Sequence, residues 1–140
     1  MAKIRHIAIY TDDPDKLADF YCDVFGMTIT QKTVTPRGGR SAWLTDGYMD
    51  VALISPEDRA APRGINHFGF TLDADERDEI LQRLKNEGIE PYKPPADRPS
   101  IEDAVRDPDG NKFDMTTHGL REDNPNRERY EREREKTEKV

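Results

Sequence analysis

Two short stretches of this chain alternate hydrophobic residues with other residues in a similar way. Residues 4 to 10 read IRHIAIY, and residues 64 to 70 read GINHFGF. Alternation with a period of two is typical of a β-strand with two different faces. Each stretch carries a histidine near its middle. Two strands of this kind, 61 residues apart, suggest that the chain contains a repeated unit.

A helical pattern follows each of these strands. Asp13 is placed to cap a helix that begins at Pro14, and Asp73 with Glu76 predicts a capping box at the second helix. A glycine ends each helical pattern. The apolar stripes expected to face the core are Leu17, Phe20, Tyr21, Val24 and Phe25 in the first helix, with Cys22 outside the stripe, and Ile80, Leu81 and Leu84 in the second.

Three further extended segments are expected after each helix. They lie at about residues 27–35, 40–45 and 48–54 in the first copy, and 89–93, 101–106 and 111–117 in the second. The final segment follows an Asp-Gly turn in both copies. The chain therefore predicts an α+β fold in which a βαβββ module occurs twice, at about residues 3–55 and 64–118, and builds one curved mixed sheet within a domain of residues 1–118.

Residues 119–140 differ in kind from this domain. They hold seven acidic and seven basic side chains and one aromatic residue, Tyr130. Such a segment cannot bury a core, so we expect a charged tail that is either helical or disordered. A helix that docks on a partner is the alternative.

Composition excludes several classes of function. Charged residues make up 36% of the chain and hydrophobic residues 34%, with a net charge of −7. An acidic chain without a basic stripe is a poor binder of nucleic acid. No apolar run approaches the roughly 20 residues that cross a bilayer. A single cysteine and the lack of a secretory pattern at the N-terminus lead us to expect a cytoplasmic protein.

His6 and His67 occupy equivalent positions of the two modules. Each is followed on its own strand face by a small residue, Ala8 or Gly69, which leaves room for the ring. If the two strands curve toward each other, both rings point into one cleft, and neutral imidazole is a common metal ligand. A lone strand histidine is usually a hydrogen-bonded structural residue, but two equivalent ones favour a metal site.

A carboxylate in the last strand of each module would complete this site. Asp114 lies in KFDMT and Asp50 in YMDVA, and a carboxylate between apolar residues is costly unless it is paired or binds a cation. Asp114 follows Gly110 by four residues, whereas Asp50 follows Gly47 by three. A shift of one residue turns a side chain to the other face, so Asp50 would need a bulge or a different turn.

The segments IRHIAIYTDDPDKLADFYCDVFGM, GINHFGF and DPDGNKFDM resemble the vicinal oxygen chelate superfamily, which includes glyoxalase I, bleomycin and fosfomycin resistance proteins and extradiol dioxygenases. The resemblance spans about residues 3–118. It implies paired modules that form a cup around a metal, with ligands at His6, His67, Asp114 and Asp50 or a neighbour of Asp50. Family members usually carry glutamate, or glutamine in the first module, where this chain has aspartate.

The resemblance implies an enzyme that uses a divalent ion (Fe, Ni, Mn or Zn) to stabilise an enolate or oxyanion on a small oxygenated substrate, as an isomerase or lyase. Asp114 or Asp50 would move the proton, and Tyr10 would orient the substrate. There are two alternatives. One is an Fe(II) dioxygenase of the extradiol type. The other is a metal-free protein that binds an antibiotic or other small molecule between aromatic walls such as Trp43, Tyr48 and Tyr10. His118 is expected to be a tail residue. A homodimer is expected, because open sheet edges invite pairing.

Overall fold

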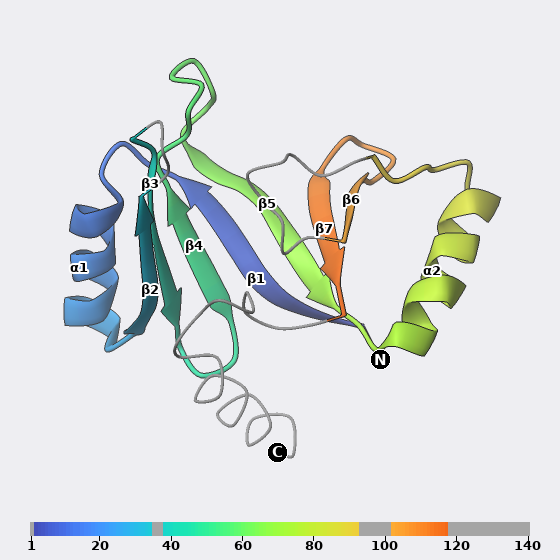
Figure 1. Ribbon diagram of the computed structural model, residues 1–140, viewed down its shortest axis with the longest axis horizontal. Helices are drawn as coiled ribbons and strands as arrows, with labels where there is room; N and C mark the ends of the chain where they lie inside the picture. The colour runs from blue at the N-terminus through green and yellow to red at the C-terminus, as the bar shows by residue number, and fades with distance from the viewer. Residues whose placement is uncertain (1, 35–37, 93–101, 118–140) are drawn as a thin grey trace.

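The computed structural model of the protein describes residues 2–34, 38–92 and 102–117 (Figure 1). Its elements, in chain order, are β1 (Lys3–Tyr10), α1 (Pro14–Phe25), β2 (Thr28–Val34), β3 (Arg40–Thr45), β4 (Asp50–Ile54), β5 (Gly64–Thr71), α2 (Ala74–Asn86), β6 (Asp103–Arg106) and β7 (Lys112–Thr116). The α+β class predicted from the sequence is confirmed. Neither of these two helices has the length and apolar character needed to cross a membrane.

The seven strands form one mixed sheet in the order β2-β3-β4-β1-β5-β7-β6. In each module the first strand pairs in parallel with the last, β1 with β4 and β5 with β7. The modules join through the antiparallel pair of β1 and β5, which lie side by side in the middle of Figure 1. This arrangement places the two histidine-bearing strands next to each other.

The second module departs from the predicted strand count. The segment expected at residues 89–93 appears only as a single bridge between Tyr92 and Ala104, and residues 93–101 lie outside the described part. Pro91 has no backbone N–H, so it cannot donate to a ladder at this point. Among the described residues the second module therefore contributes three strands, whereas the first contributes four.

The face of α1 that packs against the sheet differs from the predicted stripe. Ala18 is fully buried against β3 and β4, whereas Phe20 is 51% exposed and Phe25 68%. The small Ala18 side chain allows a close approach of helix and sheet, which turns the larger residues at positions 20, 24 and 25 outward. The part of the predicted stripe that does pack, Leu17 and Tyr21, is joined there by Cys22, which the prediction had placed outside the stripe.

Helix α2 begins with the predicted capping box, since the backbone N–H of Asp73 donates to Glu76 Oε1 at 3.3 Å. Its stripe packs as expected against a small core cluster, which contains Leu72, Val105 and Met115 together with Ile80, Leu81 and Leu84. Arg77 also fixes the helix to β6, because its guanidinium donates to both carboxylate oxygens of Asp103 at 2.7 and 3.1 Å. This pairing raises the pKa of Arg77.

The turn before β7 is held by one side chain. Asp107 accepts hydrogen bonds from the side chain of Asn111 at 2.8 Å and from the backbone N–H groups of Asn111 and Asp109 at 2.9 and 3.0 Å. These bonds, with the Asn111 side chain first, lower the pKa of the Asp107 carboxyl. The turn thereby sets where β7 starts, and so which β7 residue faces the histidines.

Candidate metal centre

The pairing of β1 with β5 relates the two histidines by a local two-fold axis. His6 lies opposite Gly69, and His67 lies opposite Ala8. In each case the histidine of one module therefore faces the small residue that follows the histidine of the other module. Side chains at paired positions project from the same face of a sheet. Strand residues that pack against α1, such as Ile9 of β1 and Leu53 of β4, project from the other face. Both rings therefore lie on the face of the sheet that α1 does not cover.

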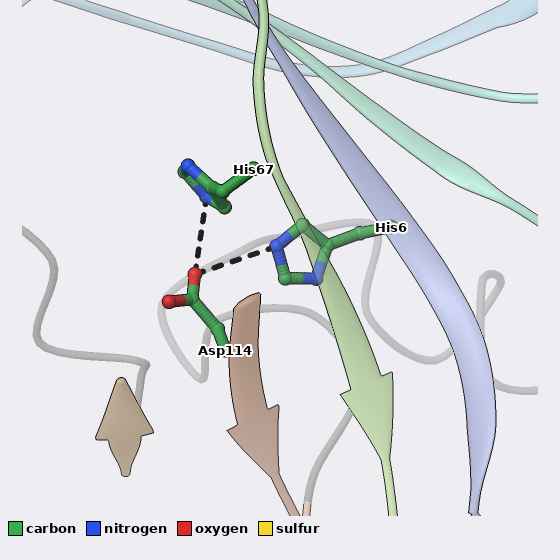
Figure 2. A group of neighbouring side chains, drawn as sticks. All are labelled: His6, His67 and Asp114. Carbon is green, nitrogen blue, oxygen red and sulfur yellow. Dashed lines mark ion pairs between the residues drawn. The ribbon is translucent and has the colours of Figure 1, made fainter. Parts of the chain in front are cut away.

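Asp114 joins the two rings from the adjacent strand β7, where it pairs with Gly69. The two imidazole centroids are 5.5 Å apart. Figure 2 shows the Asp114 carboxylate directed at both rings, with Oδ2 at 3.1 Å from His67 Nε2 and 3.6 Å from His6 Nε2. The exposed fractions of these side chains are 14% for His6, 4% for His67 and 3% for Asp114.

Gly69 is required for this arrangement. A Cβ atom at position 69 would lie 1.9 Å from His6 Cε1 and 2.1 Å from His6 Nδ1. The alternating pattern alone places each small residue beside the histidine of its own strand. The structure shows that the space above Gly69 is filled by the ring of the other module, because β1 and β5 pair in opposite directions.

The donor set fits a divalent cation. One ligand atom from each of His6, His67 and Asp114 lies within 4.8 Å of the other two, and no further His, Cys, Asp or Glu of residues 2–34, 38–92 and 102–117 belongs to this group. Two donors at about 2.1 Å from one ion lie roughly 3.0 to 3.5 Å apart, close to the two nitrogen–oxygen distances here. A ligand set of two imidazoles and one carboxylate suits Fe, Ni, Mn or Zn better than it suits Mg or Ca, which prefer sites made only of oxygen ligands.

Asp50 is buried beside this group but is not part of it. It pairs with His6 across β1 and β4 and is 5% exposed. Counting from the histidines, the partner of Asp114 in the first module is Ala52, because Ala8 pairs with Ala52 as Gly69 pairs with Asp114. By strand pairing, the first module carries its carboxylate two residues early, although the Asp-Gly turns differ by only one residue. An offset of two residues leaves Asp50 on the strand face of the histidines.

Asn66 and Trp43 lie next to the histidine rings, which the sequence pattern does not predict. His67 Nδ1 lies 2.8 Å from Asn66 Oδ1, although strict alternation places residues 66 and 67 on opposite faces. The ring of Trp43, predicted only as a wall of a binding cup, lies 6.4 Å from that of His6. Tyr48, another predicted wall, instead stacks on Arg5, with 4.1 Å between its ring centroid and the guanidinium carbon.

The remaining predicted residues lie elsewhere. Tyr10 is the last residue of β1, four positions beyond His6, or about 13 Å along the strand. His118 and the tail of residues 119–140 lie outside the described residues.

Comparison with known proteins agrees with the fold. The sequence model of the Glyoxalase/Bleomycin resistance protein/Dioxygenase superfamily matches residues 3–115. The chain belongs to this superfamily. The comparison with curated proteins found no match.

Solved structures of similar fold include a hypothetical protein, BH1468 from Bacillus halodurans C-125, with a TM-score of 0.63 and 19% identity over 86% of this chain and 98% of that one. A methylmalonyl-CoA epimerase from Mycobacterium tuberculosis gives a TM-score of 0.62 and 20% identity over 80% and 85%. A methylmalonyl-CoA epimerase in complex with methylmalonyl-CoA and NH4+ gives 0.58 and 18% over 83% and 95%. At these identities the similarity establishes the fold alone.

Proposed function

We propose that the protein is a divalent-metal-dependent enzyme that moves a proton next to an oxygen-bearing carbon of a small substrate, in the manner of an isomerase or lyase. The observation that carries the proposal is the convergence of His6, His67 and Asp114 on one buried point. A cation held there supplies stabilisation of negative charge on a substrate oxygen. Two of the similar structures named above are epimerases, which is consistent with this reaction class.

In this proposal, separate residues bind the cation, transfer the proton and contact the substrate. His6, His67 and Asp114 hold the cation. Asp50, on the same sheet face beside His6, accepts the proton and returns it, because a buried carboxylate near a cation is a suitable general base. Trp43 forms an apolar wall next to His6 that excludes water. Tyr10, at the far end of β1, contacts the distal part of the substrate.

The test is metal analysis of the purified protein beside three variants. We expect about one ion per wild-type chain, and less than about a tenth of that in His6→Ala and in His67→Ala. Asp12→Asn is the matched control, because this 82% exposed carboxylate pairs with Arg63 away from the site. Wild-type occupancy in both histidine variants would contradict the proposal, as would wild-type protein that takes up no added Ni(II), Mn(II), Fe(II) or Zn(II); the latter result favours a metal-free binding protein.

A second candidate is an Fe(II) dioxygenase. The observation that favours it is the set of two histidines and one carboxylate, with Ala52 at the place where the repeat would put a fourth ligand. This ligand set leaves positions open for oxygen chemistry. Oxygen uptake with catechols by the Fe(II)-loaded protein would support the dioxygenase, whereas proton exchange into substrate without oxygen uptake supports the isomerase.

We also propose that two copies of the chain associate. Support comes from the outward face of α1, where Phe20, Val24 and Phe25 are 51%, 58% and 68% exposed, since exposed apolar clusters of this kind often mark contact surfaces. Sedimentation equilibrium of the full chain measures the association directly. A mass of one chain at micromolar concentration would contradict it.

A further inference from the structure

We infer that Asp109 is a site of spontaneous covalent modification, at which the Asp-Gly peptide rearranges to isoaspartate. The chain contains two Asp-Gly dipeptides, Asp46-Gly47 before β4 and Asp109-Gly110 before β7. A glycine has no side chain to hinder attack of its backbone nitrogen on the preceding carboxyl group. This inference concerns the chemistry of the folded chain in water and does not depend on the proposed metal site.

The rearrangement requires no reactant other than water. The backbone nitrogen of Gly110 forms a bond to Cγ of Asp109, and the hydroxyl of the protonated carboxyl group leaves as water together with the amide proton. The product is a five-membered succinimide ring. Water then adds to one ring carbonyl and breaks its bond to the nitrogen. Opening at the former backbone carbonyl gives isoaspartate, in which the main chain runs through Cβ and Cγ, whereas opening at the other carbonyl restores aspartate.

The attacking nitrogen has a similar environment in the two dipeptides. The Gly47 N–H donates to Thr45 Oγ1 at 3.0 Å, and the Gly110 N–H donates to the backbone carbonyl oxygen of Asp107 at 2.9 Å. Both glycines have a positive φ, of 99° and 87°. The glycine half of the two dipeptides is therefore closely matched, and the aspartate carboxyl group distinguishes them.

The carboxyl group of the first dipeptide is held in place. Asp46 Oδ1 accepts hydrogen bonds from the backbone N–H groups of Tyr48 at 2.8 Å and Met49 at 2.7 Å. Rotation of this carboxyl group toward the Gly47 nitrogen would break both bonds. Loss of a single hydrogen bond to a charged group lowers the population of the reacting geometry by about tenfold or more.

The carboxyl group of the second dipeptide is not restrained in this way. Asp109 is exposed, and its backbone N–H donates to Asp107 Oδ1 at 3.0 Å. In the part of the chain that the structure describes, the Asp109 carboxylate makes no hydrogen bond or ion pair. Asp107 and Asn111 supply the bonds that close the turn. The Asp109 carboxyl group can therefore rotate toward the Gly110 nitrogen without breaking any of them.

Isoaspartate at position 109 would disturb the turn that precedes β7. The rearrangement adds one methylene group to the main chain between the nitrogens of residues 109 and 110. Asp107 accepts hydrogen bonds from the backbone N–H groups of residues 109, 110 and 111 at 3.0, 2.9 and 2.9 Å, so the added group lies inside this set. The three bonds cannot all be kept, and the modified protein is expected to be less stable.

The experiment incubates the purified full chain at neutral pH and measures isoaspartate at each dipeptide by peptide mapping and mass spectrometry. We expect at least about tenfold more isoaspartate at Asp109 than at Asp46, the factor that corresponds to one hydrogen bond to a charged group. The same chain unfolded in urea is the control, because both carboxyl groups are then free and should react to a similar extent.

Thermal unfolding provides the second readout. Incubated wild type should have a lower Tm than fresh protein, whereas Asp109→Glu should keep its Tm, because glutamate would have to close a larger ring. Asp19→Glu, at an exposed position of α1, is the matched control and should lose Tm as wild type does. An equal loss of Tm in Asp109→Glu would overturn the link to position 109.

The wild-type peptide map decides the inference even if neither variant folds. Isoaspartate at Asp46 equal to or above that at Asp109 in the folded chain would overturn it, as would a lack of isoaspartate at Asp109. A preference for Asp109 that is as strong in urea as in the folded chain would also overturn it, because local sequence rather than the turn would then explain the difference.

Discussion

At the scale of single residues, Gly69 is the position where the smallest change has the largest expected effect. Its added Cβ would lie 1.9 Å from the His6 ring, and this glycine does not have a positive φ. Alanine in a strand is otherwise preferred over glycine by about 0.5–1 kcal/mol. We therefore expect Gly69→Ala to lower the free energy of unfolding by about 1–3 kcal/mol through overpacking, and to weaken metal binding. Urea denaturation and Zn(II) titration measure the two effects.

The control removes the ring that the new methyl group would meet. In the double variant His6→Ala/Gly69→Ala, the clash is absent, so the added cost of Gly69→Ala should fall below about 0.5 kcal/mol. Equal costs of Gly69→Ala with and without the His6 ring would show that the close approach does not limit this position.

At the scale of elements, strand register decides which carboxylate lies beside the two histidines. Ala52 pairs with Ala8 as Asp114 pairs with Gly69. We expect Ala52→Asp to destabilise the metal-free protein, because the site is buried, but to increase the rise in Tm on adding Ni(II), with affinity at least about tenfold higher. Ala52→Asn is the isosteric control without the charge. The same Ni(II) response in both variants would mean that position 52 does not face the cation.

The attachment of α2 depends on the partly buried ion pairs of Arg77 with Asp103 and Glu102, in addition to the apolar stripe of the helix. Truncation in Arg77→Ala leaves the Asp103 carboxylate, whose side chain is 11% exposed, without its two guanidinium hydrogen bonds. We expect a loss of about 1–3 kcal/mol in the free energy of unfolding. Arg83→Ala removes an exposed pair with Glu79 on the same helix and should change stability by less than about 0.5 kcal/mol. Equal losses in urea denaturation would contradict this difference.

At the scale of the whole molecule, the site joins the two modules. His6 belongs to the first module, and His67 and Asp114 belong to the second. A ligand that binds only the folded protein stabilises it by about 2.7 kcal/mol at 100 times Kd. Removal of metal with a chelator should therefore speed hydrogen exchange in β4 as well as in β7, in strands on both sides of the β1–β5 pair. Faster exchange in β7 alone would show that the ion does not couple the modules.

Much of this organisation could be predicted from the residues. The alternating stretches, the caps at Asp13 and Asp73 and the Asp-Gly turns are local signals, and they led to the correct fold class and to the pairing of His6 with His67. The prediction that Phe20, Val24 and Phe25 of α1 face the core was wrong, because helical periodicity does not indicate how closely Ala18 approaches the sheet. The contact of Asn66 with His67 was not predicted, because the bulge at this position depends on the partner strand.

The sequence by itself determined that two equivalent modules exist and that each carries a histidine, because the period of the hydrophobic pattern is a property of the chain. Only the tertiary structure decided that the histidine rings lie 5.5 Å apart, that Gly69 accommodates the ring of the other module, and that Asp114 rather than Asp50 completes the group. These outcomes depend on strand register and bulges. Both are set by hydrogen bonds between segments more than forty residues apart, which no local pattern encodes.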